Sequence, residues 1–266
     1  MNSPTTPPPR LRLPVATGVL IALNVGLWLL QVANGVSPAR PSSLTLLAWG
    51  GDMPVYTLTG DTWRLLTAMF LHGGIVHLAL NMYVLAFTAP QVEYEFGTAR
   101  MLAIYLGGGL LASCASVFWS EMRSTPQNPI GLLTVGVGAS GAVMALFGSL
   151  LAGLVLPTPR FAHLPKHLQP GINKGLIQAV AINIGMGFMI KGVDNAAHVG
   201  GLLGGVLLGI VMAAAPAATG ARATLVRYLA AAGLVAACVG VLVHGANKPH
   251  LLLLRAELDA QRPDDR

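Results

Sequence analysis

Long apolar stretches separated by short polar segments dominate the pattern along the chain. A helix needs about 20 mostly apolar residues to cross the hydrocarbon core of a bilayer, which is about 30 Å thick. Stretches of about this length occur at seven places, residues 15–32, 65–90, 101–119, 138–156, 175–190, 196–215 and 228–243. Together they fill more than half of the chain and leave no room for a soluble domain of ordinary size. The pattern predicts an all-α, polytopic membrane helix bundle.

The composition supports a membrane protein. Hydrophobic residues make up 54% of the chain and charged residues only 10%, whereas about a quarter of the residues in a soluble domain are charged. The 16 Lys and Arg against 10 Asp and Glu are scattered between the apolar runs and form no basic stripe, so we expect no nucleic-acid partner. Cys114 and Cys238 lie in apolar runs without metal-ligand spacing, and no HExxH motif occurs. We therefore expect no metal and no cofactor.

The chain divides by composition into four segments. Residues 1–12 are proline-rich and are expected to be a disordered cytoplasmic head, and residues 13–215 hold six apolar spans. Residues 216–246 form a linker and a seventh span, and the mixed-charge tail 247–266 fits a short amphipathic helix. The first span is long for the apolar region of a signal peptide and no small-x-small cleavage site follows it, so we expect an uncleaved helix.

The basic residues predict the orientation, because short cytoplasmic loops are enriched in Lys and Arg. With the N-terminus in the cytoplasm, the inner segments hold Arg10, Arg12, Arg100, Arg160, Lys166, Lys174, Arg222 and Arg227. The outer loops before the last span hold only Arg40, Arg64, Arg123 and Lys191. A cytoplasmic N-terminus and, with seven spans, an outer C-terminal tail are therefore expected.

A small set of polar side chains interrupts the spans: His72, His77, Asn81, Ser140, Asn195 and His198. Such groups are costly in a bilayer and are functional candidates for that reason. His77 and Asn81 are spaced i, i+4 and so share one helix face. Hydrogen bonding between helices is the alternative explanation for all of them.

Ser140 lies in the segment Gly136-Val-Gly-Ala-Ser-Gly141, at the point where a loop enters a span. The segment also spells GxGxxG, but no alternating βαβ pattern surrounds it and no acidic residue follows within the next 20 residues, so a dinucleotide site is excluded. Glycines leave space around the hydroxyl, and the helix N-terminus favours a developing negative charge. The alternative is a serine that bonds back to its own helix.

His198 is followed by Gly201 and Gly205, which form a GxxxG pair on the same helix face. The fourth span offers a matching face of small residues that begins at Gly141. Pairing the two faces would bring Ser140 and His198 together near the outer side of the membrane. His198 could then act as general base to a serine nucleophile, with His77 and Asn81 as donors to an oxyanion.

Five motifs in a fixed order resemble those of the rhomboid intramembrane serine proteases, from Trp63 to about Gly209. They are Trp63-Arg64, the HxxxN of His77 and Asn81, the ExxxG of Glu93 and Gly97, the GxSG from Gly138 to Gly141, and His198 with Gly201 and Gly205. Each motif alone is common, whereas all five on the expected spans are specific. The resemblance implies a six-helix core, and the seventh span matches a 6+1 arrangement also found in the family.

The resemblance also implies the chemistry. Ser140 and His198 would form a catalytic dyad in a water-accessible cavity that opens to the non-cytoplasmic side. The Ser140 backbone N–H, His77 and Asn81 would form the oxyanion hole. Five residues would shape the site, Gly138, Gly141, Met144, Gly201 and Gly205, while Trp63, Arg64 and Glu93 would be structural. The implied partners are the lipid bilayer and transmembrane protein substrates, cleaved next to small residues where the helix is weak.

Several residues stand outside this pattern. Met144 occupies a position where the family often has tyrosine. Asp194 precedes His198 by four residues and could complete a triad, but the resemblance implies a dyad and Asp194 fits the loop end of the span better. His72 is expected to be structural or to face a loop. His163 and His167 belong to the expected basic cytoplasmic loop.

Two other functions compete with the protease. A catalytically silent rhomboid-like protein would bind transmembrane clients, but such proteins typically lack the serine or the histidine, and this chain has both. A channel or transporter would need polar residues along a pore or broken helices, whereas the polar groups here gather on one side. Since no presequence rich in Ser and Arg is present, we expect a bacterial plasma membrane. The substrate and the oligomeric state stay open.

Overall fold

The computed structural model describes residues 14–155, 169–190, 192–213, 220–244 and 248–261, which fold into helices and contain no β-strand. The long helices are α1 (Val15–Ala33), α5 (Ile75–Phe96), α6 (Thr98–Arg123), α7 (Ser140–Val155), α8 (Gln169–Met189), α9 (Asn195–Ala213) and α10 (Ala221–His244). The short ones are α2 (Ser43–Ala48), α3 (Pro54–Leu58), α4 (Arg64–Thr67), α11 (Pro249–Ala260) and the 3₁₀ turns η1 (Ala68–Phe70) and η2 (Ile130–Leu133). The predicted all-α polytopic bundle is confirmed. The expected head 1–12 and the loop with His163 and His167 lie outside the described residues.

Most of the long helices have the length and composition of membrane spans. Among the described residues, α1, α5, α6, α9 and α10 are long and apolar enough to cross a bilayer. In α7 the apolar stretch is shorter, Ser140–Leu154. The helix α8 is long but less apolar, because Asn173, Lys174 and Gln178 interrupt it.

The second span differs from the stretch 65–90 that the apolar pattern predicts. Residues 64–70 form α4 and η1, and the membrane helix α5 begins only at Ile75 and continues through Pro90 to Phe96. The break falls at Gly74, which has φ +120°, and a Cβ there would lie 2.1 Å from the carbonyl oxygen of Ala39. Only glycine fits this backbone. His72 therefore lies in the connection before α5 and not within a span.

The helix α7 lies at the centre of the bundle and contacts α9 along a row of glycines. A Cβ at Gly205 would lie 2.0 Å from the carbonyl oxygen of Ala145, and one at Gly201 would lie 2.2 Å from that of Gly141. On α7, a Cβ at Gly148 would lie 2.1 Å from the carbonyl oxygen of Leu202. The two backbones touch because these positions carry no side chain. We call Gly141, Gly148, Gly201 and Gly205 the glycine seam.

Glu93 ties α1 to α5. Its carboxylate accepts hydrogen bonds from the backbone N–H groups of Ala16 and Thr17, each at 3.1 Å, and from the hydroxyls of Thr17 and Thr98, each at 2.9 Å. It therefore caps the first turn of α1, where backbone N–H groups have no partner in the helix. Gly97, with φ +83°, ends α5 directly afterwards.

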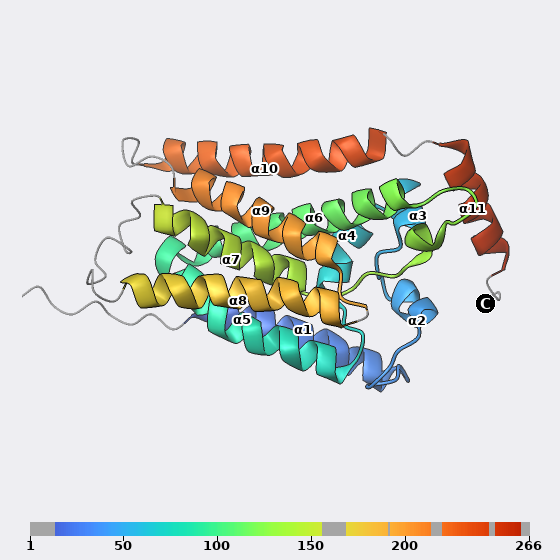
Figure 1. Ribbon diagram of the computed structural model, residues 1–266, viewed down its shortest axis with the longest axis horizontal. Coiled ribbons are helices and arrows are strands. Elements are labelled where there is room, and N and C mark those ends of the chain that lie inside the picture. The colour runs from blue at the N-terminus through green and yellow to red at the C-terminus, as the bar shows by residue number, and fades with distance from the viewer. Residues whose placement is uncertain (1–13, 156–168, 191, 214–219, 245–247, 262–266) are drawn as a thin grey trace, which may run out of the picture.

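One end of the bundle holds all the short helices that connect α1 to α5. In Figure 1 the short helices α2 and α3, in blue, and α11, in red, lie at the same end, and α10 runs the length of the bundle to reach it. We call residues 43–67, which form α2, α3 and α4, the first-loop layer. The first turns of α7 and α9 also point to this end.

Candidate active site

Ser140 begins α7 and is half-buried. The segment before it is held on both sides: Gly136 exchanges two backbone hydrogen bonds with Asp52, at 2.7 and 3.0 Å, and Gly138 N–H donates to the carbonyl of Ala68 at 2.9 Å. Gly138 has φ +128°, a conformation that favours glycine. The loop into α7 is thus fixed by the first-loop layer and by η1.

His198 lies in the first turn of α9 and is buried, with 6% of its surface exposed. The glycine seam places this turn against the first turn of α7, since Gly201 lies on the carbonyl of Gly141. On the same side, a Cβ at Gly141 would lie 3.7 Å from the carbonyl oxygen of Ala197. The first turns that carry Ser140 and His198 are therefore in direct backbone contact.

His77 and Asn81 lie on α5 beside the loop that leads to Ser140. A Cβ at Gly138 would lie 2.8 Å from Nε2 of His77 and 3.9 Å from Nδ2 of Asn81. The backbone N–H of Gly73 donates to Nδ1 of His77 at 3.2 Å. A neutral imidazole that accepts at Nδ1 carries its proton on Nε2, so the N–H of His77 lies on the side of Gly138.

One amide hydrogen of Asn81 is used within its own helix. Its Nδ2 donates to the backbone carbonyl of His77 at 2.9 Å, and an amide nitrogen carries two hydrogens. The side chain of Asn81 is buried, so its second N–H needs an acceptor. A developing oxyanion beside Gly138 would be one.

Met144 lies one turn after Ser140 and is buried, with 1% of its surface exposed. It belongs to the apolar core that also holds Ala139 and Leu146. In this chain, the position at which the family often has tyrosine therefore carries a core side chain.

Asp194 serves as a cap of α9. Its carboxylate accepts a hydrogen bond from the backbone N–H of Ala197 at 3.0 Å and a second from the hydroxyl of Ser116 on α6. Nδ1 of His198 is buried and has no hydrogen-bond partner within the described part of the chain. The hydrogen bonds of Asp194 are those of a helix N-cap, and the structure shows none of a catalytic triad.

His72, which the sequence analysis expects to be structural or to face a loop, lies in the connection before α5 and next to His77 of the candidate site. It is buried, with 1% of its surface exposed, and its ring meets that of His77 nearly edge-on at 5.3 Å. Burial and, to a smaller extent, the nearby His77 lower the pKa of His72 to about 3, so its ring is neutral at physiological pH. Asn195 begins α9 but lies against Gly187 of α8.

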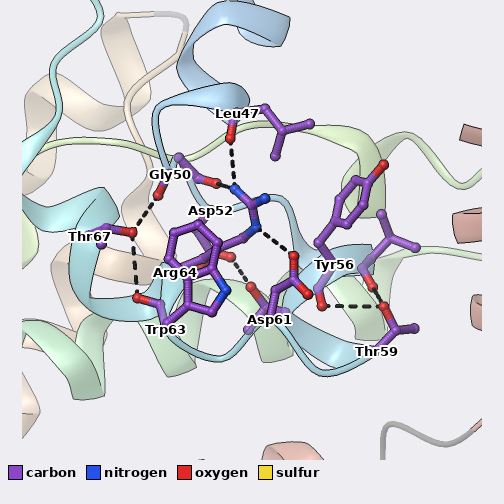
Figure 2. Close-up of polar contacts among 12 residues, drawn as sticks. Leu47, Gly50, Asp52, Tyr56, Thr59, Asp61, Trp63, Arg64 and Thr67 are labelled. Atoms are coloured by element: carbon purple, nitrogen blue, oxygen red, sulfur yellow. Dashed lines mark hydrogen bonds and ion pairs between the residues drawn. The ribbon is translucent and has the colours of Figure 1, made fainter. Parts of the chain in front are cut away.

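Trp63 and Arg64 organise the first-loop layer. The guanidinium of Arg64 donates to the carbonyls of Leu47 and Gly51 at 2.8 and 3.0 Å and to Asp61 at 3.1 Å. It also lies 4.4 Å from the ring centroid of Trp63. Figure 2 shows this side chain at the centre of the contacts. A buried cation is stable only when its donors are satisfied in this way.

Side chains that could hold a metal do not gather at this site. Across the described ranges, His, Cys, Asp and Glu side chains nowhere form a group of three or more that could bind an ion. The chemistry that the arrangement offers is that of a hydroxyl at a helix N-terminus, an imidazole and several N–H donors.

Comparison with known proteins decides the family. The sequence model of the rhomboid domain family matches residues 59–215 of the chain. This range includes the side chains described above from Trp63 to His198. The chain belongs to the rhomboid family. With its apolar helices, it is thus an integral, multi-pass membrane protein, and at the level of the family an intramembrane protease is supported.

Three rhomboid relatives show the extent of the similarity. The rhomboid protease GluP of Bacillus subtilis (strain 168) is 34% identical over 236 residues, which cover 89% of this chain and 41% of GluP. The rhomboid protease AarA of Providencia stuartii is 30% identical over 207 residues, 75% of this chain and 73% of AarA. RHOMBOID-like protein 4 of Arabidopsis thaliana is 38% identical over 177 residues, 66% of this chain and 41% of that protein. This rhomboid chain therefore spans less than half the length of two of these three relatives.

Proposed function

We propose that the chain is an intramembrane serine endopeptidase in which Ser140 is the nucleophile and His198 the general base. The observation that carries the proposal is the glycine seam, where the backbone of Gly201 lies on that of Gly141. This contact holds the first turns of α7 and α9 together, and those turns carry Ser140 and His198. Two relatives that bear the name rhomboid protease support the same activity.

The reaction follows from the groups present. His198 accepts the proton of the Ser140 hydroxyl as its oxygen attacks the scissile carbonyl, and a tetrahedral oxyanion forms. His198 then gives the proton to the leaving amine, which leaves an acyl group on Ser140. Water, activated by the same imidazole, hydrolyses the acyl group and restores the hydroxyl.

The oxyanion would be held by three kinds of donor. The backbone N–H of Ser140 stands at the N-terminus of α7, where N–H groups lack partners and the helix dipole is positive. The Nε2–H of His77 lies on the side of Gly138 because Gly73 occupies Nδ1. The second amide hydrogen of Asn81 supplies the third.

We also propose the substrate class and the placement in the membrane. A membrane helix hides its carbonyls in hydrogen bonds, so a transmembrane substrate must unwind before Ser140 can reach one. Small residues at the cleavage point would suit a site lined by Gly138 and Gly141. The distribution of Lys and Arg favours a cytoplasmic N-terminus in a bacterial plasma membrane, with the site near the outer face.

Loss of proteolysis in point variants tests the proposal. The full chain is reconstituted in liposomes with a panel of single-span model proteins that carry small residues followed by a helix-weakening residue. We expect cleavage inside the apolar span by the wild type and none by Ser140→Ala or His198→Ala. Ser149→Ala is the matched control, because this serine is buried on the same helix and its hydroxyl donates to the carbonyl of Leu146 in the preceding turn. Cleavage that persists in Ser140→Ala would contradict the proposal, and binding without cleavage by the wild type would favour a client-binding rhomboid.

A further inference from the structure

The C-terminal helix α11 packs onto the first-loop layer. Its apolar side chains Leu251, Leu254 and Leu258 belong to the same cluster as Leu47 and Val55 of that layer. Leu251 is fully buried. Lys248, just before α11, pairs at 2.5 Å with Glu121 near the end of α6. The helix is therefore held at its start and along one face.

Polar contacts fix α11 to one spot on the layer. Arg255 donates to the carbonyl and to the hydroxyl of Thr59, each at 3.0 Å, and to Oδ1 of Asp61 at 3.0 Å. Tyr56 donates from its hydroxyl to Oδ1 of Asp259, at 2.7 Å. Arg255 also lies 5.0 Å from the ring centroid of Tyr56. A guanidinium that makes several directed hydrogen bonds specifies geometry as well as charge.

Two of these contacts are shared with Arg64. Asp61 uses Oδ1 for Arg255 and Oδ2 for Nε of Arg64, at 3.0 and 3.1 Å. The ring of Tyr56 lies 5.4 Å from the guanidinium of Arg64 as well. Figure 2 shows Asp61 and Tyr56 on the same side of Arg64. The tail helix thus bonds to the residues that position the buried cation of the layer.

From Arg64 the contacts lead to Ser140. Arg64 donates to the carbonyl of Gly51, and the next residue, Asp52, exchanges two backbone hydrogen bonds with Gly136. Four residues later the chain reaches Ser140. The hydrogen bonds on this route all join residues in the described part of the chain. The route from α11 to the nucleophile contains no residue of the dyad and no donor of the oxyanion hole.

We propose that α11 is a built-in brace of the active site and that Arg255 is a positioning residue, acting through Asp61 and Arg64 on the segment 136–140. The inference rests on the proposed function for its catalytic readout. The proposal also gives a role to the seventh span, α10, because this helix carries the chain back to the end of the bundle where α11 packs (Figure 1). Loss of the brace should loosen the loop into α7 and slow acylation of Ser140, without altering the dyad.

The test uses the full chain in detergent and compares Arg255→Gln, Arg255→Lys and the wild type. Glu257→Gln is the matched control, because Glu257 is exposed on the same helix. The probe is a fluorophosphonate, whose reaction with Ser140 is followed as a maximal rate and a half-saturating concentration. Hydrogen exchange at the amides of Asp52 and Gly136 is measured in the same samples, and the amides of Ala16 and Thr17 at the other end of the bundle serve as the reference.

In Arg255→Gln we expect the maximal labelling rate to fall between about 2-fold and 30-fold, the range for residues that act on a site without touching its ligand. The half-saturating concentration should stay unchanged. Exchange at Asp52 and Gly136 should rise while that at Ala16 and Thr17 does not. Arg255→Lys keeps the positive charge but loses the several directed N–H donors of the guanidinium, so it should recover part of the maximal labelling rate. Glu257→Gln should match the wild type.

Two results would overturn the brace. One is an unchanged exchange at Asp52 and Gly136 in Arg255→Gln, whatever happens to labelling, because the effect would then not pass through their pairing. The other is faster exchange there with an unchanged labelling rate. A wild type that does not label at all, but shows the exchange response to Arg255→Gln, would support the brace and contradict the proposed protease instead.

Discussion

The glycine seam and the first-loop layer hold the two sides of the same site by opposite means. Along the seam, backbone touches backbone, and a Cβ at Gly201 or Gly205 would lie within 2.2 Å of a carbonyl oxygen. In the first-loop layer, hydrogen bonds do the holding: those of the Arg64 side chain to Asp61 and Gly51, and the two backbone hydrogen bonds between Asp52 and Gly136. Steric contact leaves no freedom, whereas hydrogen bonds that involve ionisable side chains respond to pH and to neighbouring segments. The glycine seam therefore determines how close the first turns that carry Ser140 and His198 lie. The first-loop layer determines how firmly the loop into α7 is held.

The largest expected effect is at the seam. In Gly205→Leu the added side chain has no room beside the carbonyl of Ala145, so α7 and α9 must separate. Overpacking of this kind costs about 3 kcal/mol or more when backbone must move, and we expect little folded protein and no fluorophosphonate labelling. Gly233→Leu on α10, where a Cβ meets nothing within 4 Å, is the control and should fold. Equal thermal unfolding of the two variants would show that the seam is not tightly packed.

Asn81→Ala tests the site between the glycine seam and the first-loop layer, where the side chain of Asn81 lies beside Gly138. The variant loses the proposed oxyanion donor and, in the ground state, the hydrogen bond from Nδ2 to the carbonyl of His77 within the same helix. We expect kcat to fall by about 10²–10³, or about 2.7–4 kcal/mol of transition-state stabilisation, with an unchanged melting temperature. The measurement is the rate of cleavage of a model span at saturating substrate. A full rate in the variant would remove Asn81 from the oxyanion hole.

Arg64→Lys should weaken the layer more than the seam. Lysine keeps the charge but cannot reach Leu47, Gly51 and Asp61 at once, and it loses the stacking on Trp63. Hydrogen bonds to charged groups are worth about 1.5–3 kcal/mol each, so we expect a loss of that size in unfolding free energy. Arg123→Lys, at the end of α6 beside Trp119, is the comparison and should change stability little. Denaturation in detergent compares the two, and equal stability would argue against a central role for Arg64.

The smallest effect is a pH dependence that only the layer should show. Burial raises the pKa of Asp52 to about 6, against lowering by the hydroxyl of Thr57 and by Arg64. The folded state therefore binds the Asp52 proton more tightly than the unfolded state does, so this group stabilises the fold below about pH 6 and the benefit disappears as pH rises through that value. One unit of pKa corresponds to about 1.4 kcal/mol, but the asparagine adds a buried amide N–H that needs an acceptor. The free energy of unfolding of Asp52→Asn should therefore exceed that of the wild type by about 1–2 kcal/mol at pH 8 and by little at pH 5. Melting curves at both pH values test this, and a gain that is the same at pH 5 and pH 8 would exclude titration of Asp52 as its source.

The sequence was sufficient for the parts of the fold that repeat a simple pattern. Apolar length predicted the helix bundle, and the spacing of His198, Gly201 and Gly205 predicted the contact with the span that begins at Ser140, which the structure shows. The functional roles of these residues stay predictions. Helical periodicity and small-residue spacing act locally, so they can be read without a partner.

The layer could not be predicted in the same way. Its helices α2, α3 and α4 are 6, 5 and 4 residues long, too short for a hydrophobic period, and they are held by partners far along the chain such as Gly136 and Arg255. The break at Gly73-Gly74 was hidden because the apolar residues on either side run together. The burial of His72 against His77 follows from that break. A glycine pair inside an apolar stretch, flanked by histidines, was the one local signal available.

We propose that Ser140 is a nucleophile activated by His198. The most direct measurement is the intact mass of the detergent-purified chain after treatment with a fluorophosphonate, with the adduct mapped to its peptide, in the wild type, Ser140→Ala and His198→Ala. One adduct per wild-type chain, on Ser140, is expected, and none in either variant. No adduct on a folded wild type, or an adduct on another serine that survives in both variants, would contradict it.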